Sequence, residues 1–224
     1  MSTDFLIPYA GTILRGLATT LVLSVIALVG GGIIGLSLAV VCQLRGRLLA
    51  GAIRRFVDIV RGIPVLVQML IWYLGSSAAG ISLEPFVAAS LCLTVYAAAF
   101  ISEIIRGGLG AVPSGQRDAA LAIGLSRLYA LARIEMPQVV PIVVPALIGF
   151  YIGLVKDTSM AYILGVSELT RTAKFIADVE LRPLEIYLVV AALYFLICFP
   201  LSRVVGVVDR SYQRRGLVQQ RMTA

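Results

Sequence analysis

The chain has 224 residues, of which 59% are hydrophobic and only 14% are charged, and its formal net charge is +7. A soluble domain has about 45–50% apolar and about 25% charged residues, so too little polar surface remains here to cover a soluble particle. The composition therefore excludes soluble globular and disordered proteins and predicts an integral membrane protein.

Five charge-free stretches predict helices that cross a membrane. A transmembrane helix needs about 20 apolar residues for a hydrocarbon core of about 30 Å. In chain order, the predicted spans lie at about 14–43, 62–82, 85–107, 137–157 and 185–206. The runs are apolar on every side rather than alternating, which excludes a transmembrane β-barrel. We therefore expect one all-α transmembrane domain over residues 1–224.

The first span contains closely spaced glycines. Gly30, Gly32 and Gly35 formally match a dinucleotide-binding fingerprint, but that fingerprint requires a preceding strand, which a long apolar run does not provide. Gly31 and Gly35 are four residues apart, a spacing typical of close packing between membrane helices. We therefore interpret these glycines as a helix contact and not as a cofactor site.

Residue usage also excludes several kinds of chemistry. Histidine is absent, so the chain has no histidine metal ligand or proton relay, and we expect no metal site. Cys42, Cys92 and Cys198 lie inside apolar runs and are interpreted as small hydrophobic residues. Neither Lys156 nor Lys174 ends a glycine-rich phosphate-binding loop, so we expect a chain that does not itself hydrolyse nucleotides. The start of the chain lacks a basic residue before Arg15, and we expect it to be retained rather than cleaved as a signal peptide.

The basic residues are distributed unevenly between the loops. Fourteen of the 19 fall on one side of the five predicted spans: Arg45, Arg47, Arg54, Arg55, Arg61, Arg106, Arg117, Arg127, Arg133, Arg203, Arg210, Arg214, Arg215 and Arg221. The positive-inside rule then places the N-terminus outside and the C-terminus in the cytoplasm, as an odd number of spans requires. Because these residues flank spans instead of forming a basic domain, we expect no nucleic acid partner.

The predicted cytoplasmic loop 108–136 carries helix start and stop signals. Pro113 and Ser114 favour a helix start, and Gly124 suits the left-handed residue that ends a helix. Ser126 can cap a second short helix running to Met136, after which the fourth span is expected to begin. The alternative from the residues alone is an amphipathic loop on the membrane surface.

The same loop resembles a known family. Its spacing Asp118-Ala119-Ala120-x3-Gly124-x9-Ile134-x-Met136-Pro137 is similar to the EAA loop of ABC importer permeases, EAA-x3-G-x9-I-x-L-P, with two conservative departures at 118 and 136. Further segments resemble the polar amino acid permeases of the histidine, glutamine and arginine type: Arg61-Gly62-Ile63-Pro64, Glu103-Ile104-Ile105-Arg106, Lys156-Asp157-Thr158-Ser159 and Glu168-Leu169-Thr170-Arg171.

The resemblance implies a function and a set of partners. The chain would be the transmembrane subunit of an ATP-driven importer for a polar amino acid in the bacterial cytoplasmic (inner) membrane. It would bind no cofactor itself, because ATP and Mg would be held by a separate cytoplasmic ABC ATPase. A second permease chain, identical or not, and an external or periplasmic solute-binding protein would complete the assembly within the lipid. Contact with the ATPase is expected at Gly115, Asp118, Ala119, Ala120, Gly124 and Pro137.

Polar residues near the spans are candidates for the substrate pathway. Lys156, Asp157, Thr158 and Ser159 end the fourth apolar run, where we expect the helix to break and these side chains to face a watery cavity. The alternative for them is ordinary polarity at the membrane surface. Glu103 is expected to pair with Arg106, with a gating role less favoured, and Gln68 is a further candidate for the pathway.

An ion-gradient-driven secondary transporter or channel is the alternative function. Such a chain would more often carry repeated halves or paired intramembrane carboxylates, and the sequence shows neither. A membrane-embedded enzyme is less favoured, because no nucleophile–base pair is evident in the sequence.

Overall fold

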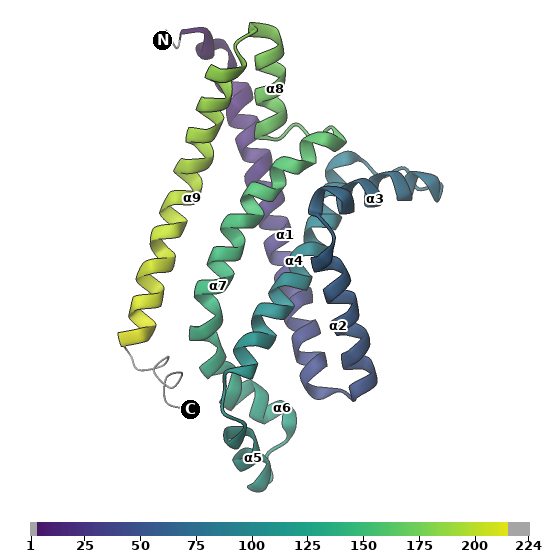
Figure 1. Cartoon of the computed structure of the whole chain (residues 1–224), viewed down its shortest axis with the longest axis vertical. Coiled ribbons are helices and arrows are strands. Elements are labelled where there is room, and N and C mark those ends of the chain that lie inside the picture. Colours follow the sequence, from purple (N-terminus) through teal and green to yellow (C-terminus); the bar gives the residue numbers. More distant parts are fainter. Residues whose placement is uncertain (1–3, 215–224) are drawn as a thin grey trace.

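In the computed structural model, which describes residues 4–214, every regular element is a helix, as the composition predicts (Figure 1). The elements are η1 (Asp4–Tyr9), α1 (Ala10–Leu44), α2 (Arg47–Gly62), α3 (Val65–Ala78), α4 (Pro85–Gly110), α5 (Ser114–Ala122), α6 (Arg127–Ala130), η2 (Leu131–Glu135), α7 (Met136–Asp157), η3 (Thr158–Leu164), α8 (Leu169–Glu180) and α9 (Pro183–Arg214). Helices α1, α4, α7 and α9 run along the long axis, with α8 at one end and α5 and α6 at the other. Arg215 and Arg221 lie outside the described residues.

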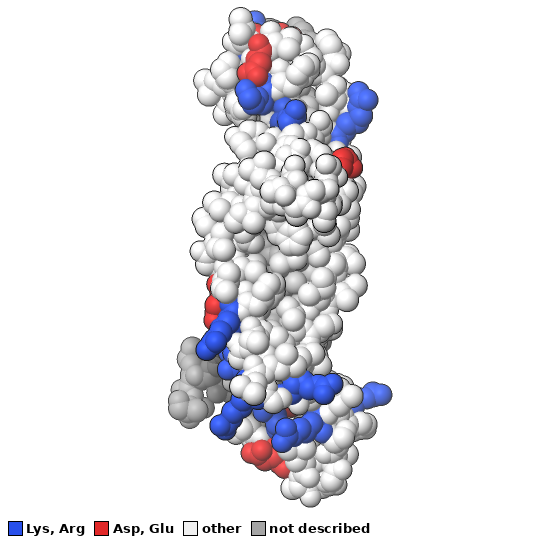
Figure 2. All heavy atoms as spheres, turned by 90° about the vertical axis from the view of Figure 1, so that its right-hand side faces the viewer, with Lys and Arg blue, Asp and Glu red and all other residues white. Residues whose placement is uncertain are grey.

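Four helical segments of the described chain are long and apolar enough to cross a membrane. They are Phe5–Leu44, Pro85–Gly110, Arg127–Leu164 and Pro183–Tyr212. Many of their large apolar side chains are exposed, for example Ile33 at 65% and Leu196 at 65%, as expected where lipid is the solvent. On the face shown in Figure 2, charged side chains gather towards the two ends and leave an apolar band between them. The first, third, fourth and fifth predicted spans therefore fall within long helices.

The second predicted span differs from its expectation of one helix over 62–82. Helix α2 ends at Gly62, and α3 begins at Val65 after a bend of 104°. Helix α3 has only 14 residues, a length of about 21 Å at about 1.5 Å per residue, which is too short to cross the hydrocarbon core alone. The cause is Pro64, which disfavours a helical backbone at Ile63, and Ile63 is extended with φ −104° and ψ 132°.

A buried glutamine stabilises this bend. Gln68 is 6% exposed, and its Nε2 donates to the carbonyl oxygens of Val60 at 2.7 Å and Ile63 at 2.8 Å. Carbonyls at the end of a helix have no partner within it, and in an apolar solvent an unpaired one costs several kcal/mol. The side chain of Gln68 therefore completes the hydrogen bonds that the break leaves open.

The most extensive helix–helix interface in the fold is the one between α1 and α4. Gly31 and Gly35 of α1 are buried, as expected for a close helix contact. A Cβ atom added to Gly35 would lie 2.7 Å from the backbone oxygen of Ala98 and 3.0 Å from the Cβ of Ile101, both on α4. Only glycine allows the two backbones to approach this closely, so the glycine pair fixes the distance between α1 and α4.

At the end of the molecule that carries α8, several elements are held together around Glu168, a residue that precedes α8. Its carboxylate is 0% exposed and accepts hydrogen bonds from the backbone nitrogens of Thr170 at 2.8 Å and Arg171 at 2.7 Å. The hydroxyl of Tyr194 on α9 donates to the same carboxylate at 3.3 Å. Burial raises the pKa of Glu168, and the hydrogen bonds it accepts oppose that change. This cap starts α8 and holds it against α9, and the sequence patterns did not lead us to expect that helix.

The α1–α4 contact predicts opposite effects for neighbouring glycines. Gly35→Ala should destabilise the protein by about 1–3 kcal/mol, because the new methyl group overlaps the backbone of α4. Gly32→Ala is the matched control, since nothing lies within 4 Å of a Cβ there and alanine is the better helix former. Thermal unfolding of the purified variants in detergent measures both effects. Equal midpoints for the two variants would contradict the close contact.

Candidate functional site

The loop between α4 and α7 forms a helix–turn–helix at the end of the molecule opposite α8 (Figure 1). Gly124 follows α5 with φ +84°, the left-handed conformation expected there. The backbone nitrogens of Gly124 and Leu125 donate to the carbonyls of Leu121 at 3.0 Å and Ala120 at 3.1 Å, which is the Schellman pattern. Ser126 then caps α6 by accepting from the nitrogen of Tyr129 at 3.2 Å. The expected glycine stop and serine cap are both confirmed.

The surface of this loop is partly as expected. Gly115, Asp118, Ala119 and Gly124 are exposed, but Ala120 is 3% exposed and packs inwards, so the expected surface contains only one of the two alanines. Beside Ala119 and Gly124, the turn and α6 expose three apolar side chains: Ile123 at 78%, Leu128 at 59% and Tyr129 at 51%. An apolar projection of this kind on a charged end of the molecule is suited to a groove on a partner protein.

Pro137 does not open a new helix, which corrects the expectation for the fourth span. Helix α6, the π-helical turn η2 and α7 form one continuous helical segment from Arg127 to Asp157. Proline inside a helix removes a backbone donor and collides with the preceding turn. The π turn immediately before Pro137 is one of the irregularities by which a helix departs from the regular hydrogen-bond pattern. The loop and the fourth span are therefore mechanically joined.

An ion pair that the sequence patterns did not reveal connects the two parts of the loop. Nε of Arg117 on α5 donates to Oε1 of Glu135 at 3.0 Å, and Nη2 donates to Oε2 at 2.6 Å. Glu135 is only 1% exposed and is the last residue of the π turn. The hydrogen bonds to Glu135 raise the pKa of Arg117 above its usual value. A glutamate flanked directly by the apolar residues Ile134 and Met136 was the only signal of this contact in the sequence.

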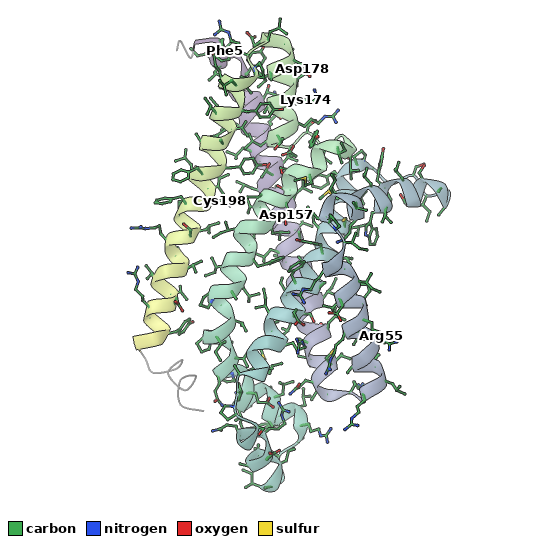
Figure 3. The ribbon with its side chains drawn as sticks, viewed as in Figure 1. Phe5, Arg55, Asp157, Lys174, Asp178 and Cys198 are labelled. Carbon is green, nitrogen blue, oxygen red and sulfur yellow. The ribbon has the colours of Figure 1, made fainter. Side chains whose placement is uncertain are left out.

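At the other end of α7, the α-helix changes at Asp157 (labelled in Figure 3) to the 3₁₀ helix η3 without interrupting the helical segment Arg127–Leu164, so the helix tightens here and the expected break is not found. Asp157 is half-buried and lies against Tyr96 of α4, whereas Lys156 is exposed and lies within electrostatic range of Cys198 on α9. Consecutive helical residues point about 100° apart, which explains the separation. The lysine and aspartate side chains therefore leave the helix in different directions.

The next two residues are placed differently again. Thr158 is 0% exposed, and its Oγ1 donates to the carbonyl of Val155 at 2.7 Å, so its hydroxyl satisfies the end of its own helix. Ser159 is half-buried. Of these four polar residues, Asp157 is the one described with a side-chain contact to α4, at Tyr96.

A row of aromatic rings continues from Asp157 along α4 and α7. The ring centroids of Tyr96 and Phe100 are 4.7 Å apart, and Phe150 stacks on Phe100 at 5.4 Å. The guanidinium of Arg61, at the end of α2, lies 5.3 Å from the centroid of Phe100. All three rings are only half-buried, so one edge of the row is open to whatever covers this face.

The inner end of the row is an ion cluster. Nε of Arg106 donates to Oε2 of Glu103 at 2.7 Å, and Arg106 Nη2 contacts the other carboxylate oxygen, which confirms the expected pair. Nη1 of Arg61 lies 3.6 Å from Oε1 of the same glutamate. Glu103 therefore links the end of α2 to α4. Gln68, in contrast, donates both of its described side-chain hydrogen bonds to backbone carbonyls at the α2–α3 bend, and none of them joins it to this row.

Comparison with known proteins gives a consistent result. Residues 31–214 match the family model described as binding-protein-dependent transport system inner membrane component. The chain is 31% identical over 214 residues to the probable glutamine ABC transporter permease protein GlnM of Bacillus subtilis, covering 96% of this chain and 99% of the relative. It is 32% identical over 205 residues to the glutamine transport system permease protein GlnP of Escherichia coli K12, covering 91% and 94%.

Solved structures share the fold. A crystal structure of an amino acid ABC transporter with histidines matches with a TM-score of 0.85 and 30% identity, covering 94% of this chain and 100% of the other. An inward-facing form of the MetNI methionine ABC transporter matches with a TM-score of 0.75, but at 24% identity it supports the fold alone.

The left-handed Gly124 predicts a defect in coupling. Gly124→Val should cost about 1–3 kcal/mol in local strain, because a β-branched residue tolerates this backbone poorly, and nothing within 4 Å would be displaced. We expect membrane insertion to persist while association with the ATPase falls, as measured by a pull-down with the purified ATPase.

Gly110→Val is the control for this variant. Gly110 ends α4 close to the loop, has no left-handed backbone and has open space around it. Normal ATPase association for Gly124→Val, or equal losses of association for both variants, would show that the turn is not part of the docking surface.

Proposed function

Because the chain belongs to the family of binding-protein-dependent transport system inner membrane components, we propose that it carries a polar amino acid along the face formed by α4 and α7. The chain is the transmembrane subunit of an amino acid importer of the ATP-binding-cassette class, like its relatives. It is a non-catalytic subunit of that importer. The observation that carries the proposed path is the half-buried row from Asp157 through Tyr96, Phe100 and Phe150 to Arg61.

Membership of this family implies an ATPase and a solute-binding protein as partners. We propose that ATP and Mg are bound by the ATPase and that this chain binds no cofactor. The exposed turn around Gly124, with Ile123 and Leu128, would enter a groove on the ATPase. Because α6 is joined to α7 through the π turn η2, this loop would give movement of the ATPase a path to the membrane-spanning part.

We propose that the loop end lies in the cytoplasm and the α8 end outside. The support is the charge distribution, because most of the basic residues lie towards the loop end and the positive-inside rule applies to short loops. The start of α1 would then lie outside and the end of α9 in the cytoplasm.

A second permease chain would cover the charged side of α2. Arg54, Arg55, Asp58 and Arg61 are exposed on α2, which packs against α1 and α4 as part of the bent second span. A charged side chain facing lipid costs at least about 2.5–3.5 kcal/mol near the centre of the bilayer. A second copy, or a similar chain, together with the water between the two chains, would remove that cost. The open edge of the aromatic row would then face the same space.

Asp157 is proposed to meet the ammonium group of the amino acid. It is an acid at the change from α-helix to 3₁₀ helix, beside Tyr96, at the outer end of the row. A row of half-exposed rings offers apolar and cation–π contacts to the rest of a small zwitterion. Lys156 and Thr158 are not included, because the first points to another side and the second bonds its own helix.

Thiol labelling tests the proposed orientation. In a variant without the three native cysteines, Lys174→Cys on exposed α8 should react with an impermeant reagent added outside intact cells, and Arg127→Cys should not. Both should react after the cells are broken. Labelling at position 127 in intact cells would invert the orientation and place the loop beyond reach of a cytoplasmic ATPase.

Asp157→Asn tests the substrate path and the function together. In liposomes that contain the complex with its ATPase and binding protein, we expect amino acid to stimulate ATP hydrolysis by the wild type. The isosteric variant should lose most of that stimulation, because the amide lacks the charge that pairs with an ammonium group. Asp178→Asn is the matched control on exposed α8, with its side chain 65% exposed.

The two variants separate the possible failures. Normal stimulation for Asp157→Asn would show that this carboxylate is not on the path. If the wild type itself shows no stimulation by any amino acid, the proposed function as an ATP-driven amino acid importer is wrong.

A further inference from the structure

Arg117 and Glu135 form the most deeply buried ionic contact of the loop. Glu135 is 1% exposed and Arg117 reaches it with two parallel hydrogen bonds, at 3.0 Å and 2.6 Å. A buried carboxylate is tolerated only when it is paired and hydrogen-bonded. The planar fork of arginine fixes both distance and orientation, so this contact is more specific than a surface ion pair.

The same arginine also reaches α1. With its amide oxygen turned towards the guanidinium, Gln43 accepts a hydrogen bond from Nη1 of Arg117 at 3.2 Å and a second one from Nη2. Gln43 lies near the inner end of α1, which is fixed against α4 by Gly31 and Gly35. Arg117 is thus held by the docking helix α5, by the start of α7 and by the end of α1.

Glu135 is placed at a point where the helix can change its register. It is the last residue of the π turn and stands two residues before Pro137, which cannot donate a backbone hydrogen bond. Single π turns inside α-helices occur frequently at functional sites. An ion pair at this turn therefore holds α5 to the first rigid residues of α7.

We propose that Arg117 and Glu135 are positioning residues that transmit movement of α5 to α7. This proposal rests on the proposed function, because it requires an ATPase that moves α5. When the ATPase displaces α5, the fork carries the displacement into α7, and Asp157 at the far end of α7 moves with it. Without the fork, α5 moves while the π turn deforms, and ATP hydrolysis continues without transport. Neither residue lies at a position specified by the motif that resembles the EAA loop.

The test is the number of amino acid molecules taken up per ATP hydrolysed, measured in liposomes with the full complex. For Arg117→Met and Glu135→Gln, we expect this ratio to fall by about 5-fold or more, the size of a typical coupling between sites. Arg117→Lys keeps the charge but loses the fork, so its ratio should lie between those of the wild type and Arg117→Met. Pull-down of the ATPase should change by less than 2-fold, roughly the scatter of near-neutral surface substitutions.

Arg133→Met is the matched control, because Arg133 lies on the same π turn but is exposed. Its ratio should equal that of the wild type. If a single variant fails to assemble, the double variant Arg117→Met with Glu135→Met takes its place in the same measurement. The double variant leaves no uncompensated buried charge at this site.

An unchanged ratio in assembled variants would overturn the proposal, and so would failure of the double variant to assemble, which would make the pair a determinant of assembly. If the ratio falls for Arg117→Met and Glu135→Gln but falls equally for the control Arg133→Met, the proposal would also be overturned. Absence of any uptake by the wild type would instead count against the proposed function.

Discussion

The close contact between α1 and α4 is the constraint on which the rest of the structure depends. In lipid, helices gain little from burying apolar surface against each other, so they associate where small residues let their backbones approach. Gly31 and Gly35 provide that approach to Ala98 and Ile101. Gly108 on the same helix α4 offers a second close surface, which Val139 and Val143 of α7 occupy. The two contacts place α7 beside a rigid pair, with the α5–α6 loop at one end of it and Asp157 at the other.

This arrangement makes α7 the connecting element between the loop and the proposed substrate path. At the loop end, a π turn and the ion pair between half-buried Arg117 and buried Glu135 join it to α5, and at the other end it changes to a 3₁₀ turn. Between the two ends, Phe150 contributes to the aromatic row that it shares with α4. The parts of α7 that depart from regular α-helix are therefore the parts that contact a partner element or the proposed substrate.

Much of the fold follows from the sequence, because lipid requires long apolar runs to be helices and the stop signals at Gly124 and Ser126 are local. The bend at Pro64 was visible as a proline, but its stabilisation by Gln68 depends on a side chain folding back over the break. Helix α8 was not predicted although Leu169, Thr172, Ala173 and Ile176 have helical spacing, because the charged residues between and after these positions are typical of a polar loop. The Arg117–Glu135 pair joins residues 18 apart and has no periodic signature. The separation of Lys156 from Asp157 follows from helix geometry, but which of them faces α4 depends on the packing of α7.

The most direct test of the account is the energy source for uptake. Liposomes containing this chain, its ATPase and its binding protein should accumulate amino acid when ATP is enclosed on the side of the loop. Accumulation should persist when ionophores abolish every ion gradient, and it should stop when ATP is replaced by a non-hydrolysable analogue. Uptake that needs an ion gradient and proceeds without ATP would contradict the account and favour a secondary transporter.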